Sequence, residues 1–208
     1  MRAVLMSIGP KWCEKIGSRK KGWEIRKTRP KLQTPFKCYI YCTSRDPHLC
    51  LMQNASGLNL IYASNYKTAI PFGGKVVNGK VIGEFVCDRI EEVYQCHSGW
   101  VAENACLSRF EFFEYLGIPY ESHLDYDKKA YAWHISDLVI YDTPKELGEF
   151  CVEGDCNCMN CHKCGWFERG NGYNVEDDCG LVYEYMGSGK TLKPLFRPPQ
   201  SWLYVEEI

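Results

Sequence analysis

The chain has 208 residues, of which 45% are hydrophobic and 14% aromatic, and its formal net charge is −1. This composition excludes a disordered chain and suits one domain of about 150 residues with an appendage. No apolar run approaches the roughly 18 residues that span a membrane, and the apolar stretch near the N-terminus is too short for a signal peptide, so we expect a cytoplasmic protein.

Positive charge is concentrated between residues 11 and 37. This segment holds ten lysines or arginines and two acids, a net charge of +8, so the remaining residues carry −9. Clustered lysine and arginine attract phosphates by counterion release, and the segment therefore predicts a surface that meets a polyanion. A solvated basic surface without a partner is the alternative interpretation.

The first expected elements are a short helix and a strand. Pro10 is followed by apolar residues at helical spacing, which predicts a helix that ends near Gly17. Residues 23–26 alternate apolar and charged side chains. This alternation indicates a half-buried strand with Glu24 and Arg26 on its polar face.

Further strands and one hairpin are expected in the next part of the chain. Residues 38–42 and 58–63 are strand candidates because they are rich in apolar and aromatic side chains. Residues 76–82 place Asn78 and Gly79 between β-branched flanks. An Asn-Gly pair in this setting predicts a β-hairpin with a type I′ turn.

One helix and one long strand are expected before residue 150. Ser108 and Glu111 have the spacing of a capping box, which predicts a helix that Gly117 ends. Residues 131–141 predict a closing strand that is interrupted at residues 136–137 and ended by Thr143-Pro144.

The spacing of these elements predicts the fold class and a division of the chain. Many strands with few helices favour an α+β fold built on a small mixed β-barrel over a βαβ sheet. After Phe150, six of the 13 cysteines follow within 29 residues, and glycine-rich turns replace the apolar pattern. We therefore expect a barrel domain over residues 1–150 and a cysteine-rich tail over residues 151–208.

Several segments of the chain resemble the ASCH domain. They are residues 3–16, 20–31, 34–42, 79–88 and 131–138, and the ending at residues 198–202 is also similar. The resemblance is closest to bacterial and phage-encoded versions. It implies a PUA-like fold, a small β-barrel with flanking helices that is related to RNA-binding domains.

The family signature, roughly Gly-x-Lys-x-x-Glu-x-Arg, matches this chain in three of its four places. Lys21, Glu24 and Arg26 stand at the Lys, Glu and Arg places. Arg19 replaces the glycine, and Gly22 replaces the Thr or Ser that often follows the lysine. These differences weaken the case for enzymatic activity more than the case for binding.

The three matched residues have complementary chemistry. Side chains two apart on a strand point to the same face, so Glu24 and Arg26 can hold one another while Lys21 reaches across. A structural ion pair is the alternative. The predicted partner is RNA or single-stranded DNA, and the predicted binding residues are Lys21, Glu24, Arg26, Lys27, Arg29 and Lys31.

Aromatic residues accompany this charge. They can stack on unpaired bases, but in so small a fold each is more often part of the core. The candidates are Trp12, Trp23, Tyr39, Tyr41 and Trp133.

Two other functions remain open at this point. One ASCH branch is similar to amidohydrolases that remove the acetyl group from acetylated cytidine. The resemblance then implies catalytic roles for Lys21, Glu24 and Glu84, with a desolvated lysine as base. A phage protein-interaction factor is the other alternative.

The tail predicts a zinc site. Cys-x2-Cys spacing lets thiolates converge on one tetrahedral ion, and a distant cysteine completes the set. The predicted ligands are Cys158, Cys161, Cys164 and Cys179, with Cys151, Cys156 and His162 as competitors. Reduced cysteines in a flexible tail without metal are the alternative.

Overall fold

The computed structural model of the chain describes residues 1–54, 57–62, 74–120, 128–153, 185–186 and 190–208. The helices are α1 (Pro10–Gly17), η2 (Gln95–His97), α3 (Ser98–Ala105), α4 (Arg109–Leu116) and η3 (Leu147–Glu149), where η is a 3-10 helix. The strands are β1 (Arg2–Ile8), β2 (Trp23–Arg26), β3 (Phe36–Cys42), β4 (Leu49–Asn54), β5 (Gly57–Tyr62), β6 (Lys75–Val76), β7 (Val81–Cys87), β8 (Ile90–Tyr94), β9 (Lys129–His134), β10 (Ser136–Lys145), β11 (Cys151–Glu153), β12 (Tyr185–Met186), β13 (Lys190–Pro194) and β14 (Trp202–Glu206). Across these described ranges, every helix is too short or too polar to cross a bilayer.

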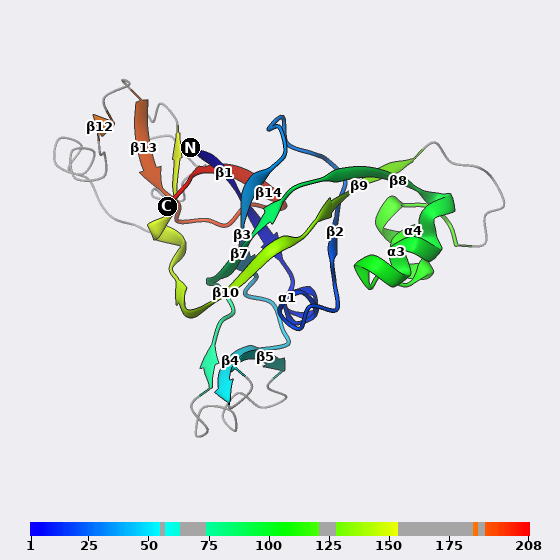
Figure 1. Cartoon of the computed structure of the whole chain (residues 1–208), viewed down its shortest axis with the longest axis horizontal. Helices are drawn as coiled ribbons and strands as arrows, with labels where there is room; N and C mark the ends of the chain where they lie inside the picture. The colour runs from blue at the N-terminus through cyan, green and yellow to red at the C-terminus, as the bar shows by residue number, and fades with distance from the viewer. Residues whose placement is uncertain (55–56, 63–73, 121–127, 154–184, 187–189) are drawn as a thin grey trace.

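The largest sheet joins the two ends of the chain. Its strand order is β10-β7-β3-β1-β14, and β1 lies parallel to β3 and antiparallel to β14. The register places Val4 opposite Tyr204 and Met6 opposite Trp202. Figure 1 shows β1, β3 and β14 together in the middle of the molecule, with the two termini close to one another.

A second sheet carries the signature residues. Its order is β2-β9-β8, and Glu24 lies opposite Trp133 in the β2–β9 register. Helices α3 and α4 pack at the far end of this sheet, as Figure 1 shows. Between them lies an apolar cluster that includes Trp23, Ile25 and Phe112. Two smaller sheets have the orders β5-β4-β6 and β11-β13-β12.

The main core lies on the face of the large sheet that α1 covers. It contains Met6, Ile16 and Ile40, and Trp133 of β9 also packs into it. The opposite face of the same sheet packs Leu5 and Tyr39 against Phe150, Leu195 and Val205. The last residues of the chain therefore belong to the same packed unit as its first strand.

Most of the expected elements are present. Helix α1 begins at Pro10 and ends at Gly17, as predicted. Helix α4 has the predicted capping box, because the Glu111 backbone N–H donates to Ser108 Oγ at 3.2 Å and Glu111 Oε2 accepts from the Ser108 N–H at 2.9 Å. Gly117 follows with φ +67°, a left-handed conformation that suits glycine.

The long strand near residue 140 ends later than predicted. It is interrupted where expected, since β9 ends at His134 and Asp137 has φ +46°. However, β10 continues through Pro144 to Lys145. This position is tolerable for proline because β10 is an edge strand, where a missing N–H costs no ladder bond on the open side.

The predicted hairpin is wrong, although its turn exists. Gly79 has φ +81°, but β6 pairs with β4 and not with β7. Both edges of β7 are already occupied, by β3 and β10. The Asn78 side chain instead ties the turn to a neighbouring loop, accepting from the Leu49 N–H at 2.7 Å and donating to the Arg45 carbonyl at 2.8 Å.

Two further expectations need correction. Strand β2 is buried on both faces rather than half-buried. The described strands form four separate sheets, so they do not close into one hydrogen-bonded ring, although the sheet-rich α+β class is as predicted. The boundary at residue 150 stays a prediction, but β14 lies beyond it and adds a strand to the sheet of the first part.

Candidate functional site

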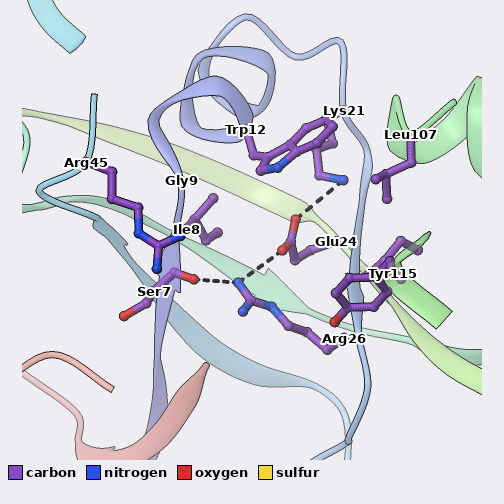
Figure 2. A pocket seen from close by; sticks show the side chains of 11 residues that line it. Ser7, Ile8, Gly9, Trp12, Lys21, Glu24, Arg26, Arg45, Leu107 and Tyr115 are labelled. Carbon is purple, nitrogen blue, oxygen red and sulfur yellow. Dashed lines mark hydrogen bonds and ion pairs between the residues drawn. The ribbon is translucent and has the colours of Figure 1, made fainter. Parts of the chain in front are cut away.

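Three charged side chains from one short stretch meet in the interior. Glu24 and Arg26 lie two apart on β2, and Lys21 lies at the turn before it. Glu24 Oε2 is 3.4 Å from Lys21 Nζ, and Glu24 Oε1 is 3.0 Å from an Arg26 guanidinium nitrogen. Figure 2 shows the carboxylate between the two cations. The arrangement is the one that the spacing of the signature predicts.

Lys21 is the most deeply buried of the three. Its side chain is 1% exposed, and Nζ donates to the carbonyl of Ala105 at 2.6 Å, at the end of α3. The Trp12 ring lies 5.1 Å from the same nitrogen. Burial lowers the pKa of Lys21 below its ordinary value, while the nearby Glu24 carboxylate opposes this shift.

Arg26 connects the site to both ends of the chain. One terminal nitrogen donates to the carbonyl of Ser7 at 2.8 Å, and the other lies 3.3 Å from Ser201 Oγ. Its Nε is buried and has no hydrogen-bond partner among the described residues. Ser7 is at the end of β1 and Ser201 immediately precedes β14, so the guanidinium lies where the two strands meet.

A cavity of about 330 Å³ opens beside this cluster. Its volume is at the lower end of the range for small-molecule sites. The charged lining side chains are three cations and one acid, so the cavity favours a ligand or ligand fragment with negative charge. The lining residues are Ser7, Ile8, Gly9, Trp12, Lys21, Glu24, Ile25, Arg26, Arg45, Leu107 and Tyr115 (Figure 2).

The remaining predicted binding residues lie outside this cavity. Lys27, Arg29 and Lys31 are exposed on the irregular segment that leaves β2. Lys27 Nζ lies 5.2 Å from the ring of Tyr115, which lines the cavity. The structure thus divides the six predicted residues into a buried set and an exposed set that begins at the cavity wall.

Glu84 does not join Lys21 and Glu24. It lies on β7 opposite Tyr39, on the face of the large sheet turned away from the main core. There it pairs with Lys37 at 3.3 Å and accepts a hydrogen bond from the Tyr141 hydroxyl. Alternation along β7 places its neighbour Phe85 in the main core, so Glu84 faces the other way and cannot supply the carboxylate implied for the amidohydrolase site.

Most of the candidate aromatic residues are part of the core. Trp12 lines the cavity, whereas the other four are buried. Sequence reasoning missed Tyr115 and Arg45 as lining residues. A helix around residue 115 was predictable, but which face it turns to the cavity depends on its packing against β2. Nothing local in the sequence marks Arg45.

Within the described residues, no group of three or more His, Cys, Asp or Glu side chains is arranged to hold a metal ion. The four predicted zinc ligands, Cys158, Cys161, Cys164 and Cys179, lie outside the described residues. Seven of the described cysteines carry free thiols: Cys13, Cys38, Cys42, Cys50, Cys87, Cys96 and Cys106. Burial raises the pKa of Cys13, Cys38 and Cys87 in the main core.

Removal of Glu24 tests the buried cluster. In Glu24→Ala, two buried cations lose their counter-charge, so we expect the free energy of unfolding to fall by about 3–5 kcal/mol. Glu91→Ala is the matched control, because Glu91 is also a strand glutamate paired with an arginine, but its side chain is 48% exposed. The control should lose no more than about 1 kcal/mol in chemical denaturation. Equal losses in the two variants would contradict the role of Glu24.

The fold resembles two solved structures. No protein-family model matches the sequence, and no curated protein matches it. The ASCH protein from Zymomonas mobilis is 16% identical, with a TM-score of 0.50 over 99% of this chain and 88% of that one. A serine-to-alanine mutant of that protein gives 14% identity and a TM-score of 0.51 over 99% and 89% of the two chains. At such identities the likeness shows the fold alone, and the fold of this chain is similar to that of the Zymomonas mobilis ASCH protein.

Proposed function

We propose that the protein binds RNA or another single-stranded nucleic acid at the cavity and along the exposed basic segment. The observation that carries this proposal is that Lys27, Arg29 and Lys31 are exposed and not paired with acids in the described part of the chain. Unpaired cations that are close in sequence are available to phosphates.

The cavity supports the same proposal. Glu24 can accept hydrogen bonds through lone pairs that its two cationic neighbours leave free, and the Nε–H of Arg26 has no partner in the part of the chain that the structure describes. A nucleotide offers both donors on its base and negative charge on its phosphate. Trp12 and Tyr115 add aromatic surface to the wall. The lining therefore suits one unit of a nucleic acid chain.

Neutralising the exposed set tests this function. In the triple variant Lys27→Gln, Arg29→Gln, Lys31→Gln, we expect weaker binding to single-stranded oligonucleotides and a shallower dependence of affinity on salt. Each lost phosphate contact lowers the slope of log K against log salt by about 0.7. Fluorescence anisotropy at several salt concentrations measures both quantities.

The matched control makes the same change of charge elsewhere. Lys75, Arg89 and Lys128 are also exposed, and the variant Lys75→Gln, Arg89→Gln, Lys128→Gln should retain the slope of the unaltered protein. If the two triple variants lose affinity equally, binding reflects net charge alone. Absence of oligonucleotide binding at low salt would reject the proposal.

A second candidate function is the hydrolysis of an acylated nucleoside such as acetylated cytidine. The observation in its favour is Lys21, a lysine with a lowered pKa at the wall of a small cavity. A neutral amine there can take a proton from an attacking water, and Glu24 holds the amine in position. Since Glu84 lies elsewhere, this chemistry depends on Lys21 and Glu24 alone.

Incubation with acetylated cytidine tests this candidate. We expect acetate release that Lys21→Met abolishes, because methionine fills a similar volume without a base. The neutral fraction of Lys21 grows as pH rises through its lowered pKa, so the rate should rise with pH at values below 10.5, the ordinary value for lysine. Lack of acetate release, or release that Lys21→Met leaves intact, would favour a pure binding module.

For the tail, we propose one zinc ion held by Cys158, Cys161, Cys164 and Cys179. Thiolate–zinc binding is worth on the order of 10 kcal/mol in zinc peptides, which is more than a short glycine-rich segment gains by apolar burial. We expect one zinc per chain by elemental analysis of protein purified under reducing conditions. The double variant Cys161→Ser, Cys164→Ser should lose it, whereas Cys50→Ser, which changes a buried cysteine of β4, should not. Metal-free protein from such a preparation would contradict the site.

A further inference from the structure

The basic segment that follows β2 is held in place by the last strand of the chain. The last residue of β2 and two residues of the segment each contact a residue at or just before β14. Arg26 lies 3.3 Å from Ser201 Oγ, Thr28 Oγ1 accepts from Trp202 Nε1 at 3.1 Å, and the Lys31 backbone N–H donates to the Tyr204 hydroxyl at 2.7 Å. The segment has no regular secondary structure, so these bonds fix its course.

Two of the three contacts come from aromatic side chains on one face of β14. Trp202 and Tyr204 are two residues apart on the strand, and their ring centroids are 5.4 Å apart. Both are partly buried, and Trp202 also packs against Trp133, with ring centroids 5.8 Å apart. Their N–H and O–H groups are engaged with the basic segment. The rings therefore lie beside that segment in a defined orientation.

The charges around these rings are mainly positive. The guanidinium of Arg2 lies 5.9 Å from the Tyr204 ring, and Lys27, Arg29 and Lys31 follow along the adjacent segment. The nearest carboxylate on β14, Glu206, is 3.6 Å from the N-terminal ammonium group. An aromatic surface bordered by cations suits a chain that carries both flat rings and phosphates.

We propose that Trp202 and Tyr204 form a base-stacking surface for single-stranded nucleic acid, whose phosphates contact Lys27, Arg29 and Lys31. This inference rests on the proposed nucleic-acid binding and adds two residues and a mode of recognition to it. Aromatic side chains beside a basic track are how proteins hold unpaired bases without reading their sequence. These rings lie near the cavity, because Arg26 lines the cavity and contacts Ser201, next to Trp202.

The first test uses the unaltered full-length protein. Its affinity is measured for a short oligouridine, for the oligothymidine of the same length and for an abasic oligonucleotide with the same number of phosphates. Stacking of even one base predicts binding of the base-containing strands at least roughly fivefold tighter than the abasic strand. Equal affinity for all three, or equal affinity for a duplex of the same length, would overturn the stacking surface.

The second test separates the ring from its hydroxyl. Tyr204→Phe keeps the ring and loses the bond to Lys31, whereas Tyr204→Leu loses both. We expect Tyr204→Phe to retain the preference for base-containing over abasic strands and Tyr204→Leu to reduce it by roughly fivefold or more. Trp202→Phe and Trp202→Leu form the second matched pair.

The outcomes distinguish this inference from the proposed function. If the Lys27, Arg29 and Lys31 triple variant loses affinity but neither leucine variant changes the preference for bases, nucleic-acid binding stands and the stacking surface is rejected. If the unaltered protein binds no oligonucleotide, both are rejected. Circular dichroism of each variant shows whether it is folded. A preference for base-containing over abasic strands in the unaltered protein establishes stacking, and its loss in folded Tyr204→Leu or Trp202→Leu, but not in Trp12→Leu, assigns the stacking to β14 rather than to the cavity wall.

Discussion

The buried cluster of Lys21, Glu24 and Arg26 is the constraint on which the rest of the structure depends. Removing one charge from water costs several kcal/mol, and attraction between charges offsets this only when the geometry is good and the remaining donors are satisfied. Only one carboxylate pairs with the two cations here, so backbone and hydroxyl oxygens must accept hydrogen bonds from their remaining donors. These come from the end of β1, the end of α3 and the residue before β14. The cluster can form only where these segments, distant in sequence, meet.

The cationic side chains of this short stretch are therefore of two kinds, buried and exposed. Lys21 and Arg26 pair with Glu24 and are shielded from solvent, whereas Lys27, Arg29 and Lys31 are exposed and form no ion pair with a carboxylate within the described residues. The buried pair lines the cavity, and Glu24 compensates one of its two positive charges. In the proposed function, the exposed set provides the electrostatic attraction toward phosphates. Strand β2 and the segment after it thus place the cavity and the proposed phosphate-binding surface at adjacent positions.

Sequence reasoning predicted the features that local physics determines. The spacing of Lys21, Glu24 and Arg26 gave their mutual contact, and capping chemistry gave α1 and α4. It failed where partners are distant in sequence. The Asn-Gly turn exists, but its flanks pair with other strands, and Glu84 lies on the wrong face of β7 because the face depends on which sheet β7 joins. The close pairing of β7 with β10 requires glycine at position 83, since a Cβ there would lie 2.3 Å from the Val139 carbonyl oxygen of β10.

The pairing of β1 with β14 is the feature that local sequence indicates least and that the site requires most. A shift of one residue in an antiparallel pair turns every side chain to the opposite face. The observed register places Met6 opposite Trp202 and Val4 opposite Tyr204, which sets both rings on the face of the main core, beside the segment that follows β2. The same register brings Ser201 to Arg26. The two ends of the chain therefore position the buried cluster and the aromatic surface together, so that a change in their pairing would alter both at once.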